Sequence, residues 1–162
     1  MGSETDLLSL AVDIAREAGE LAQRRRSEGV AIAATKSALA DIVTEADREV
    51  ESRIRARIAE ARPDDGFLGE ESGAQRGTSE VTWVVDPIDG TVNYAYGLPF
   101  YAVSIAAVAG EPHPAAWTAL AGAVFAPALG ELFTASRGGG AFLGQRRLRV
   151  LVPAGEAGAL LA

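Results

Sequence analysis

Apolar side chains recur at helical spacing through the first part of the chain. Over residues 6–28 they lie three or four positions apart and form one stripe of a helix, at Leu7, Ala11, Ile14, Ala18 and Leu21. A second stripe predicts another helix over about residues 44–61, with Ala46, Val50, Ile54 and Ile58 on one face. The turn-forming sequence Pro63-Asp64-Asp65-Gly66 then ends this helix.

The remaining patterns indicate short extended segments. Residues 29–40, which include Lys36, carry neither stripe and predict a short strand and a loop. The apolar runs at 67–69 and 81–85 are typical of strands, and each is followed by acidic residues. Helices combined with strands in this way indicate the α+β class. At 162 residues and 48% hydrophobic composition, the chain can bury one core.

Composition and charge narrow the classes of function. The chain has no Cys, so it can form neither disulfides nor thiolate metal sites. Its polar, acidic N-terminus and the lack of a membrane-length apolar run predict a cytoplasmic protein with no membrane partner. A net charge of −7 argues against nucleic-acid binding. The basic cluster Arg24-Arg25-Arg26 is interpreted as a solvated helix end.

The most informative segment follows the strand-like run that ends at Val85. It reads Asp86-Pro87-Ile88-Asp89-Gly90-Thr91. Hard cations such as Mg²⁺ prefer oxygen ligands, so the two aspartates and the carbonyl of Ile88 are candidate ligands. Gly90 would let the backbone approach an anion closely. Asp-Pro and Asp-Gly pairs also form turns, but their place at a strand end favours the metal site.

Other acidic residues have structural interpretations as well. Thr44 and Asp47 have the spacing of a capping box, and from the residues alone this interpretation is favoured over catalysis. Glu70 and Glu71 could both be solvated. Because adjacent residues of an extended chain point to opposite sides, only one of them is expected to face a cation.

Taken together, these motifs resemble the inositol monophosphatase family of Mg²⁺-dependent, lithium-sensitive phosphatases. The similarity rests on Gly69-Glu70-Glu71-Ser72 and on the segment from Asp86 to Tyr94, where Tyr94 replaces the usual Phe. It continues through residues 97–100, 103–105 and 126–133, and covers about residues 7–150. The resemblance implies the layered α/β/α/β/α sugar-phosphatase fold, with a short helix near 91–96 and strands near 100–108, 115–125 and 132–135.

The resemblance also implies a set of metal ligands for two or three Mg²⁺ ions. One ion would be held by Glu70, Asp86 and the Ile88 carbonyl, and a second by Asp86 and Asp89. Of the two glutamates, Glu70 is therefore the one expected to face the cations.

The catalytic roles are implied in the same way. Thr91, tied to Asp47 and near Glu70, would accept a proton from the attacking water, so these three residues are the candidate catalytic groups. The amides of Gly90 and Thr91 would bind phosphate oxygens. Water would attack in line, with no covalent enzyme intermediate.

The chain departs from the family in its length. Full-length members carry a later Trp-Asp-x-x-Ala-Gly segment whose Asp completes the second metal site. The segment Trp117-Thr118-Ala119-Leu120-Ala121-Gly122 imitates it, with Thr118 in place of the acid. Pro153-Ala154-Gly155-Glu156 predicts the start of a further helix. We therefore expect residues 1–162 to be an N-terminal domain, truncated after about residue 150–162.

Several functions remain open. The first is a phosphatase acting on a small phosphorylated alcohol such as inositol 1-phosphate, with the full-length form a homodimer. Histidinol phosphate, fructose 1,6-bisphosphate and 3′-phosphonucleotides are alternative substrates within the same fold. The other class is an inactive Mg²⁺-binding fragment or dimerisation module.

Overall fold

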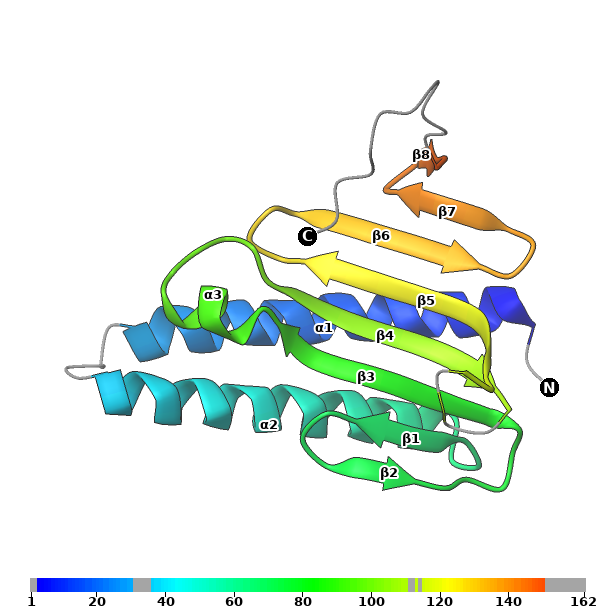
Figure 1. Ribbon diagram of the computed structural model, residues 1–162, viewed down its shortest axis with the longest axis horizontal. Coiled ribbons are helices and arrows are strands. Elements are labelled where there is room, and N and C mark those ends of the chain that lie inside the picture. The colour runs from blue at the N-terminus through cyan, green and yellow to red at the C-terminus, as the bar shows by residue number, and fades with distance from the viewer. Residues whose placement is uncertain (1–2, 31–35, 111–112, 114, 151–162) are drawn as a thin grey trace.

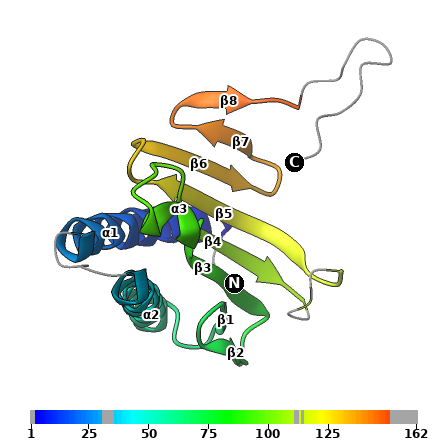
Figure 2. The same cartoon turned by 60° about the vertical axis from the view of Figure 1, so that its left-hand side comes forward.

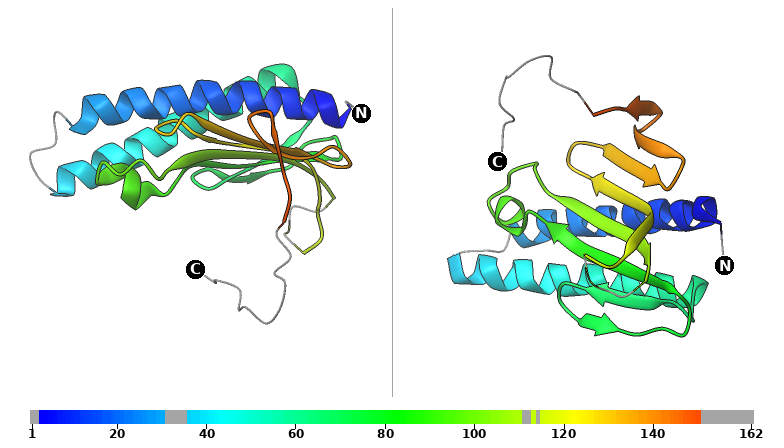
Figure 3. Two further views of the ribbon diagram at one scale, coloured as in Figure 1. Left: turned by 90° about the horizontal axis from the view of Figure 1, so that it is seen from above. Right: turned by 45° about the vertical axis from the view of Figure 1, so that its right-hand side comes forward.

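The computed structural model describes residues 3–30, 36–110, 113 and 115–150 (Figure 1). Two long helices, α1 (Glu4–Val30) and α2 (Lys36–Ala61), run side by side. Both lie on the same face of a sheet, as the view from above shows (Figure 3). Helix α1 packs on β4, β5 and β6, whereas α2 packs on β3.

Within the described residues, one eight-stranded sheet has the order β2-β1-β3-β4-β5-β6-β7-β8. Its strands are β1 (Gly66–Gly69), β2 (Gly73–Gln75), β3 (Val81–Asp89), β4 (Ala102–Ala109), β5 (Thr118–Ala126), β6 (Glu131–Ser136), β7 (Gly140–Leu143) and β8 (Arg146–Leu148). Strands β1 and β3 are parallel, and the other neighbours are antiparallel. A short helix, α3 (Thr91–Ala95), joins β3 to β4.

The apolar stripes of both helices face the sheet as the sequence predicts. Leu7, Ala11, Ile14 and Ala18 of α1 are buried, as are all four predicted positions of α2. The alanines of α1 let the helix approach the sheet closely. At Gly19 the contact is closer still, since a Cβ atom there would lie 2.5 Å from the ring of Phe125.

The predicted start of the second helix is wrong. Helix α2 begins at Lys36, not near Thr44, so residues 36–40 are helical and not a strand or loop. Residues 31–35 of the expected loop lie outside the described residues. The Ala-Leu-Ala sequence at 38–40 is rich in strong helix formers, which explains the earlier start. Because the helix passes through Thr44, this residue cannot be an N-cap, and the capping-box interpretation is also wrong.

Most predicted strands are present, with different limits. Strand β3 continues through the acidic residues to Asp89, and its register with β4 shifts between Asp86 and Asp89, as at a bulge. Strands β2, β7 and β8 were not expected. Each has only three or four residues and lies beside glycines, so its sequence lacks a clear alternating pattern.

The two faces of the sheet differ in how they are covered. In the part of the chain that the structure describes, no helix covers the face opposite α1 and α2 (Figures 2 and 3). None of the helices in the described ranges is long and apolar enough to cross a membrane.

Candidate functional site

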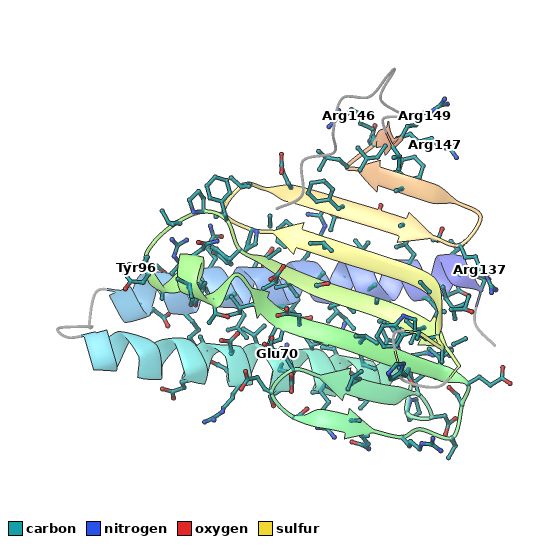
Figure 4. All side chains as sticks on the ribbon, viewed as in Figure 1. Glu70, Tyr96, Arg137, Arg146, Arg147 and Arg149 are labelled. Atoms are coloured by element: carbon teal, nitrogen blue, oxygen red, sulfur yellow. The ribbon has the colours of Figure 1, made fainter. Side chains whose placement is uncertain are left out.

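The ends of two parallel strands bring the acidic motifs together. In the register of β1 with β3, Gly69 lies opposite Val85, and the Glu70 amide donates a hydrogen bond to the Val85 carbonyl at 3.3 Å. Parallel strands end at the same edge of a sheet, so Glu70 lies next to Asp86. Figure 4 labels Glu70 at the end of β1, beside α2.

Asp86 is in direct contact with Glu70. Burial, the negative charge of Glu70 and a hydrogen bond that protonated Asp86 donates to Glu70 all raise the pKa of Asp86 well above its usual range, and the charge of Asp89 adds to the effect. The Oδ1 atom of Asp86 is buried and has no hydrogen-bond partner among the described residues. Asp89, at the end of β3, is exposed.

Helix α2 contributes Asp47 to the same region. Its side chain is 5% exposed, and its Oδ1 atom also has no hydrogen-bond partner in the described structure. Burial raises the pKa of Asp47 to about 7, and the nearby charges of Glu71, Glu70 and Asp86 add to this rise. All the charges that act on Asp47 among these described residues are negative, so they repel its ionised form.

The two adjacent glutamates differ in their contacts. Glu70 hydrogen-bonds with Asp86, whereas Glu71 lies 3.7 Å from the guanidinium of Arg48 on α2. This difference agrees with the expectation that one glutamate faces the aspartates and the other does not. Both charges still act on Asp47.

The start of α3 lies directly after these aspartates. Gly90 has a φ of 89°, and a Cβ atom there would lie 2.8 Å from the Phe100 carbonyl oxygen. The backbone conformation at position 90 therefore requires glycine, whether or not an anion binds there. The Thr91 hydroxyl donates a hydrogen bond of 3.2 Å to the Ile88 carbonyl. The expected hydrogen bond between Thr91 and Asp47 is not among those of the described residues, so this pairing stays a prediction.

The donor set fits a hard divalent cation. Carboxylate and carbonyl oxygens are what Mg²⁺ prefers, and the unpartnered Oδ1 atoms of Asp47 and Asp86 are available to ligate or orient a water. Within the described ranges, however, no three His, Cys, Asp or Glu side chains are arranged to hold one metal ion together. The residues gather in one region, and their side chains would have to turn toward a common point to bind it.

Helix α3 is fixed to the end of α1 by an aromatic cluster. The Tyr94 hydroxyl donates to the Ala22 carbonyl at 2.7 Å, and its ring meets Tyr101 edge-on at 5.0 Å between centroids. Arg26 lies over both rings and donates to the Leu98 carbonyl. Arg25 pairs with Glu49 and Glu28. Arg25 and Arg26 are therefore only partly buried, against α2 and α3, whereas Arg24 is exposed as expected for a solvated helix end.

The opposite end of β3 has a structural role. The buried Trp83 indole donates to Asp65 at 2.9 Å, and Asp65 also accepts hydrogen bonds from Arg62 and Ser79. A hollow of about 480 Å³ lies at this end, with Asp64, Asp65, Ser79 and Glu80 in its lining. Asp65 contacts none of the acidic residues at the other end of β3, so we assign it to the stability of the fold.

Comparisons with known proteins agree with this geometry. A sequence profile described as the inositol monophosphatase family matches residues 3–160. An inositol-1-monophosphatase from Mesorhizobium japonicum is 42% identical over 145 residues, which cover 89% of this chain and 52% of that protein. Relatives from Xylella fastidiosa and Pseudomonas aeruginosa carry the name Nus factor SuhB.

Solved structures give the same result. The extragenic suppressor protein suhB from Bartonella henselae has a TM-score of 0.75 and 38% identity, covering 90% of this chain and 54% of the other. SaIMPase-II with 2′AMP bound has a TM-score of 0.75 and 30% identity, covering 92% and 52%. The expected α+β fold is confirmed, and the chain spans about half the length of these proteins. The chain belongs to the inositol monophosphatase family.

Proposed function

We propose that this chain supplies most of the active site of a Mg²⁺-dependent phosphomonoesterase, which hydrolyses a small phosphorylated alcohol such as inositol 1-phosphate. One observation carries the proposal: α2, β1 and β3 bring Asp47, Glu70 and Asp86 into one region, where burial and mutual repulsion raise the pKa of both aspartates. A divalent cation would relieve this repulsion, and a cation is also what an acidic site needs to accept a phosphate. Membership of the family supports the phosphatase class.

Each residue would have a distinct task. Glu70, Asp86, Asp89 and the Ile88 carbonyl would hold the ions. When bound, Mg²⁺ supplies an activated water and neutralises charge on the phosphate and the leaving oxygen. The Thr91 hydroxyl donates to the Ile88 carbonyl in the structure. In the proposed reaction it would turn this proton toward Asp47 and accept the proton of the attacking water.

Asp47 and the start of α3 would complete the chemistry. The unpartnered Oδ1 of Asp47 is an acceptor for the proton that Thr91 must pass on. Gly90 is the N-cap of α3 and Thr91 its first residue, and we assign their amides to the phosphate oxygens. No covalent intermediate is needed, because water is the nucleophile.

A nucleotide substrate is the second candidate. It is favoured by the structure of SaIMPase-II with 2′AMP, which this chain matches over 92% of its own length. In this proposal the residues of the site would contact metal and phosphate and not the alcohol, so they would accept either class. Comparing inositol 1-phosphate, 2′-AMP, 3′-phosphonucleotides, histidinol phosphate and fructose 1,6-bisphosphate at equal concentration would rank them by kcat/KM.

The decisive test is removal of the ligands one at a time in the full-length protein. Asp86→Asn and Asp89→Asn should each abolish nearly all phosphate release while the circular dichroism spectrum stays unchanged, because Asn keeps the shape but loses the charge. Glu80→Gln, an exposed acid at the other end of β3, is the matched control and should keep full activity. Near-wild-type turnover of both aspartate variants at saturating Mg²⁺ would refute the assignment.

A further inference from the structure

A second acidic side chain of α2 is as deeply buried as Asp47. Glu51 is 2% exposed and lies one helical turn after Asp47, on the face that packs toward the sheet. None of the ion pairs within the described ranges includes Glu51. A buried carboxylate without a cation is costly, so its hydrogen bonds are what make the position tolerable.

Both oxygens of Glu51 are used by the turn that follows β1. Oε2 accepts the amide hydrogen of Glu71 at 2.8 Å, and Oε1 accepts that of Ser72 at 2.9 Å. Charge-assisted hydrogen bonds from backbone amides are short and strong. The carboxylate thus binds two successive amides directly after Glu70, across 20 residues of sequence.

The glycine before Glu70 makes room for this carboxylate. A Cβ atom on Gly69 would lie 2.4 Å from Oε2 of Glu51 and 2.7 Å from the Phe67 ring. Real Cβ atoms essentially never make non-bonded contacts this short, so a side chain at position 69 would push Glu51 away from the amides. The contact therefore depends both on the missing side chain at Gly69 and on the buried carboxylate of Glu51.

The backbone around Glu70 is consequently hydrogen-bonded to both β3 and α2. Its own amide donates to the Val85 carbonyl of β3, and the next two amides donate to Glu51 of α2. Glu70 itself is exposed, so apart from its contact with Asp86 its position follows from the backbone that carries it. Figure 4 shows Glu70 at this junction of β1 with α2.

We propose that Glu51 is a positioning residue, which ties the Glu70 turn to α2 and so sets the place of the Glu70 carboxylate relative to Asp47 and Asp86. The inference deepens the proposed function and rests on it. Glu51 acts through the two amides and touches neither metal nor substrate. This positioning role requires the length of the Glu51 side chain as well as its charge.

Three substitutions in the full-length protein separate the length of this side chain from its charge. Glu51→Asp keeps the charge but is one methylene too short to reach both amides. Glu51→Gln keeps the length and one acceptor oxygen, and Glu51→Ala removes both. Ile54→Val, buried on the same helix but away from the turn, controls for a general loss of α2 packing. The readouts are Mg²⁺ affinity by calorimetry and hydrogen exchange at the amides of Glu71 and Ser72.

We expect Glu51→Asp and Glu51→Ala to weaken Mg²⁺ binding by about tenfold or more and to speed exchange at both amides. Glu51→Gln should restore part of the affinity and part of the protection, and it tests the proposal even where Glu51→Ala does not fold. Ile54→Val should bind Mg²⁺ normally.

Two results would overturn the proposal. The first is wild-type Mg²⁺ affinity in Glu51→Asp despite fast amide exchange, which would make the contact purely structural. The second is an equal loss of affinity in Ile54→Val. The proposed function fails in a different way: Asp86→Asn would then leave Mg²⁺ affinity unchanged, while the Glu51 variants still lose protection at the two amides.

Discussion

Two buried aspartates show how environment separates structural from functional acids. Asp65 accepts hydrogen bonds from Arg62, Ser79 and Trp83, which outweigh the effect of burial and lower its pKa. Asp47 is similarly buried but faces other acids, and its pKa rises to about 7. A raised pKa of this kind is characteristic of a functional site, because binding of a proton or a cation relieves the repulsion.

Replacing Asp47 tests this distinction. Asp47→Asn removes a buried charge that its neighbours repel, so the metal-free chain at pH 8 should be equally stable or more stable, by up to about 1–3 kcal/mol. Turnover of the full-length protein should fall by roughly 10²–10⁴, because Thr91 loses its proton acceptor. Urea unfolding and phosphate release measure the two effects. A destabilised variant with unchanged turnover would leave Asp47 with a structural role only.

The sequence located these site residues unevenly. Glu70, Asp86, Asp89 and Thr91 could be proposed as site residues because they lie in short contiguous motifs, and their roles stay predictions. Glu51 and Asp65 were missed, since their roles depend on hydrogen bonds to residues 20 and 18 positions away. One signal was present for Asp65, because a buried Trp needs a partner for its indole N–H.

Helices and strands, like single residues, could be predicted only in part. Both helices were predicted because their apolar stripes repeat over many turns, and each predicted position is buried except Leu21, which is partly buried. The beginning of α2 was missed, because residues 36–40 carry good helix formers but no stripe that identifies them. The short strands β2, β7 and β8 depend on pairing with neighbours and not on their own sequences.

The hydrogen bonds of Asp65 join the end of α2 to the start of β3, and their strength should depend on pH. A lowered pKa means that the folded state favours the charged form, so this stabilisation is present above the ordinary aspartate pKa of 3.8 and is lost as pH falls below it. Asp65→Asn should therefore cost about 1.5–3 kcal/mol at pH 7. In unfolding experiments the difference from wild type should narrow toward pH 3. If the difference in unfolding free energy between wild type and Asp65→Asn stays constant between these pH values, the charge of Asp65 has no such role.

For the molecule as a whole, the two faces of the sheet are unequal. Helices α1 and α2 cover one face, whereas the row Val84, Ala106, Gly122 and Ala135 crosses four strands on the other, each residue opposite the next. Beside this row, Val124 is 37% exposed and pairs with Phe133. An apolar sheet surface of this kind is typical of an interface. The relatives are about twice as long as this chain, so they have further residues that could cover it.

This open face leads us to expect that the 162-residue chain alone self-associates and is a poor enzyme. Apolar surface exposed to water favours association, and without the family's distal Asp its second metal site would have weaker affinity. Sedimentation should show concentration-dependent oligomers. The Val124→Lys substitution should shift them toward monomer, because burying a charged side chain in an interface costs free energy. Phosphate release from inositol 1-phosphate should be roughly 10²-fold or more below that of a full-length relative measured in parallel. A monomeric chain with comparable turnover, lost again in Asp89→Asn, would show that these 162 residues form a complete phosphatase.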